Sequence, residues 1–302
     1  MRILVTGASG FLGASLARQA VRRGWDVLGT HHSRPRSLPG FSTRPLDLED
    51  TPGLKALVRD FRPQCVAHAA AVSKPDDCAR DPERCRRVQV EATRLLAREA
   101  AALKARFLYT SSDLVYDGSR EWVDETGPAR PLGAYGRSKL EAEEAVLGTP
   151  GLDACVLRIS LIFGWSAGGA RCFVEDWIES LRQGRPFSAF ADQYRCPLWV
   201  EDAAASLLDL AVSPATGIFH LAGPERLSRL EFARMLCRVF GFDQGLVRPG
   251  SVKDAAFLDP RPLSLGLKTG RLISALARPP LGPEEALREM LHQAGGAPVW
   301  ND

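Results

Sequence analysis

Tyr135 and Lys139 are the residues best suited to chemistry, and they stand four positions apart at the start of a segment with a helical pattern, 134–147. Residues at this spacing project from the same face of a helix. A tyrosine, with a pKa of about 10, is a poor acid or base at neutral pH, and a neighbouring ammonium favours its phenolate. Ser112 follows the predicted strand 106–110 and can offer a second hydroxyl to the same carbonyl oxygen. We therefore expect proton transfer to or from a carbonyl group, whereas an isolated Tyr-Lys pair would more simply be a surface feature.

A glycine-rich turn near the start of the chain is suited to holding a phosphate. Residues 2–5 have the pattern of a buried strand, residues from 11 onward that of a helix, and Gly7, Gly10 and Gly13 lie at the junction. Gly7 would permit the tight turn, Gly10 a close approach of a pyrophosphate, and Gly13 close packing of the helix, whose N-terminus faces the anion. Three of the 27 glycines could also form an ordinary turn. Their place at the first strand, with a second predicted strand at 25–30, favours dinucleotide binding.

The end of this second strand indicates which dinucleotide would bind. An NAD enzyme usually has an acidic residue there, which binds the ribose 2′-hydroxyl. Here the residues are donors suited to a 2′-phosphate, namely His31, His32, Ser33 and Arg34. We expect a preference for NADP(H), with NAD(H) as the other cofactor to consider, Arg34 as the main phosphate contact, and Asp47 and Leu48 beside the adenine. The alternative is that the four residues belong to an exposed loop.

The order of the predicted elements indicates the fold class. Strands are predicted at 2–5, 25–30, 65–71, 106–110 and 154–159, and helices at 11–23, 52–61, from 81 onward, and at 134–147. This alternation is typical of an α/β protein with a doubly wound parallel sheet of the Rossmann type. After residues 31–34 at the end of the second strand, a Pro-rich loop is expected to run on to residue 46.

Past residue 160 the rhythm changes. Helices are predicted at 173–183 and 201–211, strands at 186–190 and 217–221, a capping box at 228–231, and a last helix from 283. We expect a dinucleotide-binding domain at 1–160, to which 199–221 returns. Residues 161–198 and 222–302 would form a smaller C-terminal α/β substrate-binding lid over the carboxyl ends of the strands.

The composition is that of an ordinary globular enzyme. The 302 residues, 45% hydrophobic and 25% charged, suffice for a sizeable core. A net charge of +3 gives no reason to expect nucleic acid or a membrane surface as a partner, and no apolar run reaches membrane-spanning length. Because the first predicted strand directly follows Met1, we expect a cytoplasmic location.

The seven cysteines are odd in number, scattered and never in a CxxC pair. We therefore expect free thiols in a reducing compartment. Cys78, Cys85, His31 and His32 show neither zinc-finger nor HExxH spacing, so no metal site is expected.

Four motifs in order resemble the extended short-chain dehydrogenase/reductase family: TGASGFLG at 6–13, HAAA at 68–71, SSDLVYDG at 111–118 and YGRSK at 135–139. Within that family the chain is most similar to the dTDP-4-dehydrorhamnose reductase group. The resemblance implies an NADPH-dependent reductase of a nucleotide-linked 4-keto-6-deoxysugar, with Ser112, Tyr135 and Lys139 as catalytic triad and Ser111 as a less favoured substitute. It also implies that Lys139 contacts the nicotinamide ribose.

The glycine turn and the resemblance together indicate the residues around each ligand. For the cofactor these are Gly7, Ser9, Gly10, Phe11, Leu12, Gly13, His31, His32, Ser33, Arg34, Asp47, Leu48, Ala69, Ala70, Ala71, Tyr135, Lys139 and Ser160; for the substrate they are Ser73, Asp113, Arg195 and Arg261. The two arginines are the candidates for a nucleotide diphosphate, because guanidinium groups suit phosphate oxygens. Alternatively, they hold the lid in place through carboxylates such as Asp192 or Asp254.

Three positions depart from the family pattern. Gln89 stands where the family usually has Asn, in the long helix before the catalytic strand. The reductase group usually has Asn at the position of Gly133 and an aromatic residue at that of Leu161. The resemblance places these last two near the sugar, so the triad chemistry is better supported than the identity of the substrate.

Two other functions would use the same features. A nucleotide-sugar epimerase or dehydratase shares the turn and the triad, but a dehydratase would also need an acidic pair beside Ser112, and only Asp113 is present. A non-catalytic NADP-binding regulatory subunit, like that of methionine adenosyltransferase, also resembles the reductases, and an intact triad disfavours it. In each case we expect a small-molecule ligand, and we leave a homodimer open.

Overall fold

A parallel sheet organises the structure, a computed structural model that describes residues 1–32, 40–167, 170–276 and 278–295. Its strands are β1 (Arg2–Thr6), β2 (Asp26–His31), β3 (Ser42–Pro45), β4 (Cys65–His68), β5 (Arg106–Ser112), β6 (Ala154–Ile159) and β11 (Gly217–Leu221). They lie in the order β11-β6-β5-β4-β1-β2-β3, and every neighbouring pair is parallel. The order reverses between β1 and β4, so the predicted doubly wound Rossmann sheet is confirmed.

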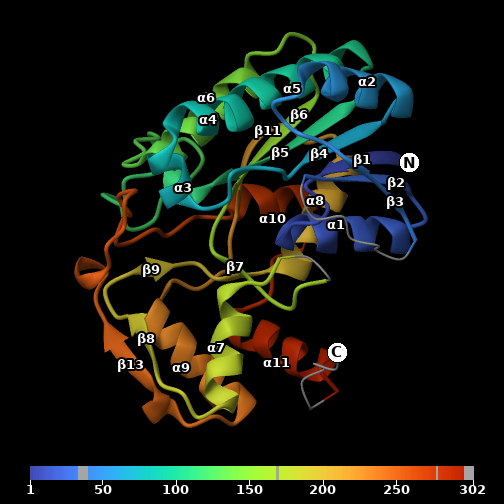
Figure 1. Cartoon of the computed structure of the whole chain (residues 1–302). Coiled ribbons are helices and arrows are strands. Elements are labelled where there is room, and N and C mark those ends of the chain that lie inside the picture. Colours follow the sequence, from blue (N-terminus) through green and yellow to red (C-terminus); the bar gives the residue numbers. More distant parts are fainter. Residues whose placement is uncertain (33–39, 168–169, 277, 296–302) are drawn as a thin grey trace.

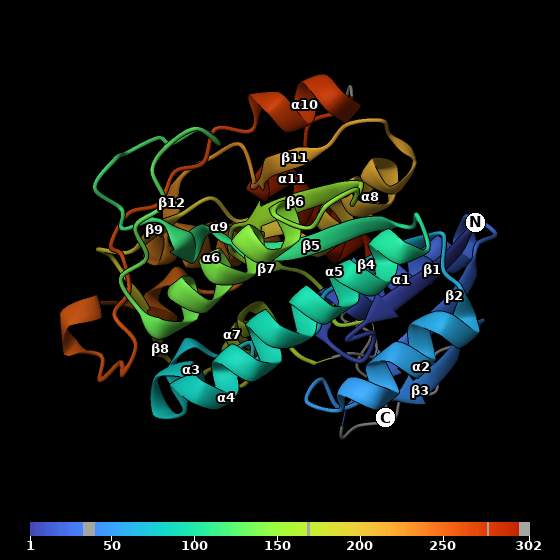
Figure 2. The same cartoon turned by 90° about the horizontal axis from the view of Figure 1, so that it is seen from above.

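Helices cover both faces of this sheet (Figures 1 and 2). The elements around it are α1 (Phe11–Arg22), α2 (Thr51–Phe61), α3 (Pro75–Arg80), α4 (Pro82–Arg86), the π turn η1 (Arg87–Glu91), α5 (Ala92–Ala102), α6 (Ala134–Leu147), α8 (Val200–Val212) and α10 (Gly270–Leu276). Successive residues of β1 point to opposite faces, as a strand requires. Ile3 and Val5 pack in the core that includes α1 and α8, whereas Leu4 packs in the core that includes α2 and α5.

A second group of elements lies below the sheet in the view of Figure 1. It contains α7 (Phe173–Arg182), α9 (Arg229–Phe240), α11 (Pro283–Gln293), the 3₁₀ turns η3 (Gln244–Leu246) and η4 (Val252–Asp254), and three strand pairs: β7 (Ile162–Phe163) with β10 (Leu198–Trp199), β8 (Phe187–Phe190) with β13 (Val247–Gly250), and β9 (Tyr194–Arg195) with β12 (Leu227–Ser228). The capping box predicted at 228–231 is present at the start of α9. The core that packs α1 on the sheet continues here through Phe163, Ile178 and Phe232.

The chain leaves the sheet after β6 and returns to it at β11, which pairs with β6. The division into two domains, with the return of 199–221 to the first, stays a prediction. The Pro-rich loop expected between residue 34 and residue 46 is wrong in part, because 42–45 form β3, a mostly exposed edge strand with little apolar sequence. The single helix expected from 81 is also replaced by α4, η1 and α5, while α3 was not expected at all.

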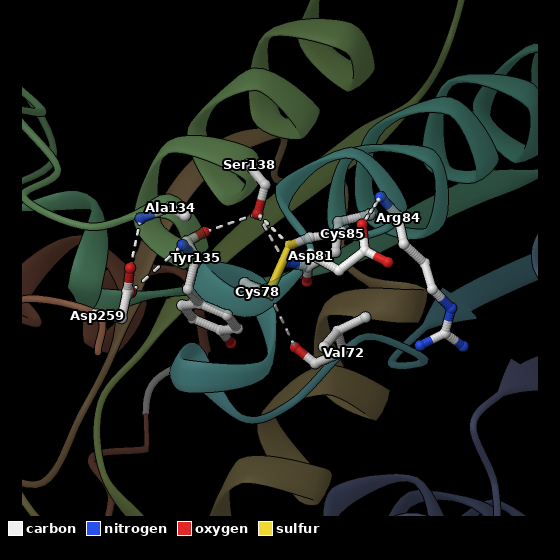
Figure 3. The surroundings of a disulfide bond; sticks show 10 residues. Val72, Cys78, Asp81, Arg84, Cys85, Ala134, Tyr135, Ser138 and Asp259 are labelled. Carbon is white, nitrogen blue, oxygen red and sulfur yellow. Dashed lines mark hydrogen bonds between the residues drawn. A yellow bond between two sulfur atoms is a disulfide. The ribbon is translucent and has the colours of Figure 1, made fainter. Parts of the chain in front are cut away.

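The prediction that all cysteines are free thiols is wrong for two of them. Cys78 of α3 and Cys85 of α4 form a disulfide, with Cα atoms 5.1 Å apart (Figure 3). The chain turns at Asp81 between the two short helices, so residues seven apart in sequence meet in space. The remaining five are free, namely Cys65, Cys155, Cys172, Cys196 and Cys237.

The described residues contain neither a candidate metal site nor a membrane-spanning helix. No group of three or more His, Cys, Asp or Glu side chains in the described part of the chain is arranged to hold a metal ion. No helix in those same residues is both long and apolar enough to cross a membrane. The cytoplasmic location stays a prediction.

Candidate active site

One cleft of about 760 Å³ brings together the site residues expected from the sequence. Its lining includes Gly7, Ser9, Gly10, Phe11, Leu12, Gly13, His31, His32, Asp47, Leu48, Ala69, Ala70, Ala71, Ser73, Ser112, Asp113, Tyr135, Lys139, Ser160, Arg195 and Arg261. Ser33 and Arg34 lie outside the described residues. The glycine turn and the Ser-Tyr-Lys set therefore share one space, although they come from opposite ends of the first 160 residues.

The glycine turn lies too close to neighbouring backbone to accept side chains at Gly7 and Gly13. Gly7 has a φ of +71°, and a Cβ there would lie 2.8 Å from the Cα of Ala70. A Cβ on Gly13 would lie 2.1 Å from the carbonyl oxygen of Gly7. Helix α1 follows, with Gly10 as its N-cap residue and without a side-chain cap. Its first amides are thus available to an anion, which the positive end of the helix favours.

At the end of β2, two histidines line the same cleft. The Nδ1 atom of His31 is buried and has no hydrogen-bond partner among the described residues. His32 Nε2 lies 3.7 Å from Asp47 Oδ2. Arg84, which no motif in the sequence indicates, also lines the cleft, where it donates to Glu49 Oε2 at 3.3 Å.

Tyr135 and Lys139 lie in the first turns of α6 and face the cleft. The Nζ atom of Lys139 lies 5.9 Å from the Tyr135 ring centroid and donates to the Thr110 carbonyl at 2.9 Å. Burial lowers the pKa of Lys139 to about 7, against a smaller opposing effect of Glu143. Burial also raises the pKa of Tyr135, further raised by Asp113, while a hydrogen bond from Ser112 opposes the rise. The expected lowering of the Tyr135 pKa by Lys139 is therefore wrong, because burial and the Asp113 charge both raise this pKa and Lys139 is not among the groups that lower it.

The two candidate serines are directed to different partners. Neighbouring residues of a strand project to opposite faces, and Ser111 and Ser112 are consecutive in β5. The Ser111 hydroxyl donates to Glu143 Oε1. The Ser112 hydroxyl donates to Asp113 Oδ1 at 3.2 Å and accepts from the Leu114 amide at 3.2 Å. Because Ser112 lines the cleft with Tyr135 and lowers the pKa of that residue, it is the serine placed to act with Tyr135.

Asp113 stands at the start of the 3₁₀ turn η2 (Asp113–Val115) that follows β5. Ser160 donates to its Oδ2 at 2.9 Å, and Arg195 Nε lies 3.9 Å from the same atom. Burial raises the pKa of Asp113 in spite of these contacts. A carboxyl group with this environment can retain or exchange a proton close to Ser112.

Both arginines assigned to the substrate line the cleft, and both also make contacts within the protein. Arg195 donates to the carbonyls of Tyr194 at 2.7 Å and Pro262 at 2.9 Å. Arg261 donates to Asp76 Oδ1 at 2.9 Å. The carboxylates near them are thus Asp113 and Asp76 rather than the Asp192 and Asp254 considered from the sequence.

A buried charge network lies behind the site and was missed by sequence reasoning. Glu143, two turns after Tyr135 on α6, accepts from Arg158 of β6, the shortest of three contacts being 2.6 Å. Arg158 donates to Tyr116 Oη at 2.6 Å, and that oxygen lies 2.7 Å from His220 Nε2. The sequence offers one sign of this network, Glu143 four residues after Lys139. Its partner Arg158 lies on another element, so no local pattern joins the two.

Gln89, at the family's Asn position, lies in the π turn η1. Its Nε2 donates to Ser138 Oγ at 2.7 Å and lies 3.3 Å from the sulfur of Cys85. Its Oε1 is buried with no hydrogen-bond partner in the described part of the chain. Its amide therefore contacts the buried Ser138 of α6 and the disulfide.

A doubly wound sheet whose glycine turn shares a cleft with Ser112, Tyr135 and Lys139 defines the extended short-chain dehydrogenase/reductase class. The chain belongs to the RmlD substrate binding domain family, which it matches over residues 1–295.

Comparisons with individual proteins give two kinds of relative. The chain is 34% identical over 255 residues to methionine adenosyltransferase 2 subunit beta of Xenopus tropicalis, covering 82% of this chain and 75% of the relative. It is 31% identical over 261 residues to the probable low-salt glycan biosynthesis reductase of Haloferax volcanii, covering 84% and 85%. Its fold matches that of the dTDP-4-dehydrorhamnose reductase of Bacillus anthracis in complex with NADP, with a TM-score of 0.86, 22% identity, and 97% and 99% coverage.

Proposed function

We propose that the protein is an NADPH-dependent reductase that converts the keto group of a nucleotide-linked 4-keto-6-deoxysugar to a hydroxyl. The observation that carries this proposal is the single cleft that contains both the glycine turn and the Ser112, Tyr135 and Lys139 side chains. A ketone held there would meet a proton donor and the cofactor in the same space. The similarity to the Haloferax and Bacillus proteins, both of which are named as reductases, supports this choice.

The residues of the cleft fit NADP(H). The pyrophosphate would bind at the uncapped N-terminus of α1, against Gly7 and Gly13, where no side chain fits. The unpartnered Nδ1 of His31, together with His32, would contact a 2′-phosphate, and we assign Ser33 and Arg34, outside the described residues, to the same group. When bound, NADPH supplies the hydride.

The chain's own residues would supply the proton. Because its pKa is raised, the Tyr135 hydroxyl remains protonated at neutral pH, as a donor to a carbonyl oxygen must be. Ser112 would hold that oxygen with its own hydroxyl. Lys139, whose pKa is about 7, would favour proton loss from Tyr135 whenever it carries its charge.

The substrate's sugar and diphosphate would lie toward Ser73, Asp113, Arg195 and Arg261, which line the part of the cleft not assigned to the cofactor. Each guanidinium can exchange a carbonyl or carboxylate contact for a phosphate oxygen. Since the pyrophosphate does not change during hydride transfer, these arginines would act on binding rather than on the chemical step.

NADPH oxidation measured against a panel of keto-sugar nucleotides, including a dTDP-linked 4-keto-6-deoxyhexose, tests the proposal. We expect turnover with stoichiometric NADPH loss. Removing one hydroxyl in Tyr135→Phe should lower kcat by about 10²-fold or more and leave the NADPH dissociation constant unchanged. A Tyr135→Phe protein that retains most of its activity would show that another residue donates the proton.

A second function is favoured by one specific observation, the 34% identity to methionine adenosyltransferase 2 subunit beta. In that case the protein would bind NADP(H) and act as a regulatory subunit. Tight NADPH binding without turnover of any ketone would select this function. Turnover of a ketone that carries no nucleotide would instead retain the reductase and replace its substrate.

A further inference from the structure

Helix α6, which carries Tyr135 and Lys139, has no N-terminal cap of its own. Its N-cap residue is Gly133, which has no side chain to accept the free amides of the first turn. Asp259, on a segment more than a hundred residues later, accepts them instead. Its Oδ1 lies 2.6 Å from the Ala134 amide and its Oδ2 lies 3.4 Å from the Tyr135 amide. Figure 3 shows Asp259 against this first turn, with both bonds drawn.

Gly133 leaves the space that Asp259 occupies. A Cβ at position 133 would lie 2.3–2.5 Å from the carboxylate atoms of Asp259, well inside contact distance. The backbone of Gly133 is extended, with φ −106° and ψ 173°, so its conformation does not call for glycine. The reductase group has Asn at position 133, and glycine here leaves space for the Asp259 carboxylate. The capping group therefore comes from the distant segment and not from the N-cap residue of the helix.

The capping segment is anchored beside the cleft. Asp76 of α3 accepts from the Asp259 amide at 3.3 Å and from Arg261 Nη2 at 2.9 Å. Arg261 also stacks on Phe257, its guanidinium carbon 4.1 Å from the ring centroid. Asp259 is only 3% exposed. Asp259 and Arg261 are two residues apart: the Asp259 side chain caps α6, and the Arg261 side chain lines the cleft.

We propose that Asp259 is a positioning residue for the proton donor: it fixes the first turn of α6, and with it Tyr135, from the segment that also presents Arg261 to the substrate. This inference rests on the proposed function. A carboxylate at the N-terminus of a helix bonds the amides and meets the positive end of the helix dipole. Loss of that contact releases the backbone of Tyr135 without removing a group that touches substrate or cofactor.

The first test compares Asp259→Ala with Asp254→Ala, an exposed aspartate of the same segment. We expect Asp259→Ala to lower kcat by about 10- to 100-fold, because small displacements of a reacting group are costly. The KM for the nucleotide sugar and the NADPH dissociation constant should stay within about twofold, as they depend on other residues. Hydrogen exchange of the 134–139 amides should become faster. Asp254→Ala should change none of these quantities.

The second test moves the carboxylate back onto the helix in Gly133→Asp/Asp259→Gly. An aspartate at the extended N-cap position should bond the first-turn amides directly, and so restore both kcat and amide protection. Gly133→Asp alone should fail, because two carboxylates would compete for one space. Unchanged kcat and unchanged exchange in Asp259→Ala would overturn the proposal. If the unaltered protein reduces no ketone, the proposed function fails, while faster exchange in Asp259→Ala and its reversal in the double variant still support the positioning role.

Discussion

Burial determines the charge of the two residues assigned to proton transfer. Lys139 is 3% exposed, and its ammonium is compensated by the Thr110 carbonyl, the Tyr109 ring 5.0 Å away and the charge of Glu143. The same desolvation raises the pKa of Tyr135. The site therefore holds a protonated tyrosine beside a lysine whose charge changes near neutrality.

Replacing Lys139 should change how stability depends on pH. The pKa of Lys139 is about 7 in the folded protein and 10.5 ordinarily. Between these two pH values the unfolded chain binds more protons than the folded one. The contribution of Lys139 to the free energy of unfolding therefore rises with pH. We expect the Tm of the unaltered protein to rise relative to that of Lys139→Met across this range. His68 and His220, whose pKa values are lowered to about 3 and about 4, change the pH dependence of stability only below this pH range. Exposed Lys253→Met is the control, and a constant Tm difference would contradict the assignment.

Glu143 should be essential for stability although it touches no ligand. Glu143→Gln removes the charge that Arg158 bonds and leaves a buried guanidinium unpaired, which costs about 3–5 kcal/mol of unfolding free energy. Chemical denaturation of Glu143→Gln and of the exposed neighbour Glu144→Gln measures the difference. Equal stability of the two variants would show that water or a rearranged Tyr116 compensates Arg158.

Local patterns explain which site residues could be predicted. Tyr135, Lys139 and the glycines of the first turn stand in short motifs, so their spacing was enough to select them. Asp259 and Arg158 act on α6 from segments whose proximity depends on the finished fold. Glycine at 133 was noted as a departure, but its reason required the position of the Asp259 carboxylate.

Among the elements, α3 and α4 depend most on a single link. The Cys78–Cys85 disulfide closes a loop of about eight residues, for which the loss of chain entropy corresponds to about 2.5 kcal/mol. Reductant should therefore lower the Tm of the protein, and should not affect Cys78→Ala/Cys85→Ala. Alkylation followed by mass measurement without reductant gives the bond directly. The disulfide predicts that five cysteines are alkylated without reductant. Alkylation of all seven, together with a Tm insensitive to reductant, would show that Cys78 and Cys85 are not joined.

Helices and strands with a strong hydrophobic pattern could be predicted from the sequence. Breaks within a helix and strands without such a pattern could not. Helix α6 and strand β6 occupy the residues expected, because a continuous apolar or amphipathic run determines each. β3 has no apolar run, since it is an exposed edge strand held by its pairing to β2. The π turn at Arg87–Glu91 interrupts the helix at three buried residues, and no local pattern in the sequence indicates it.

At the scale of the whole molecule, residues 1–160 should not fold independently. Without β11 the edge of β6 is unpaired, and without α8 one side of α1 loses the contacts of Gln19 and Arg18 with Glu201. We expect this fragment, produced alone, to aggregate or to lack cooperative unfolding and NADPH binding. The complete chain in the same buffer is the control. A monomeric fragment that binds NADPH as tightly as the complete chain would contradict this expectation.

The pairing of β6 with β11 also affects the protein during its synthesis on the ribosome. About sixty residues separate the end of β6 from the end of β11, which at 5–20 residues per second corresponds to roughly 3 to 12 s of elongation. Throughout that interval the apolar strand 154–159 has an open hydrogen-bonding edge. Nascent chains that stall between residues 160 and 221 are therefore the form of this protein most in need of a chaperone.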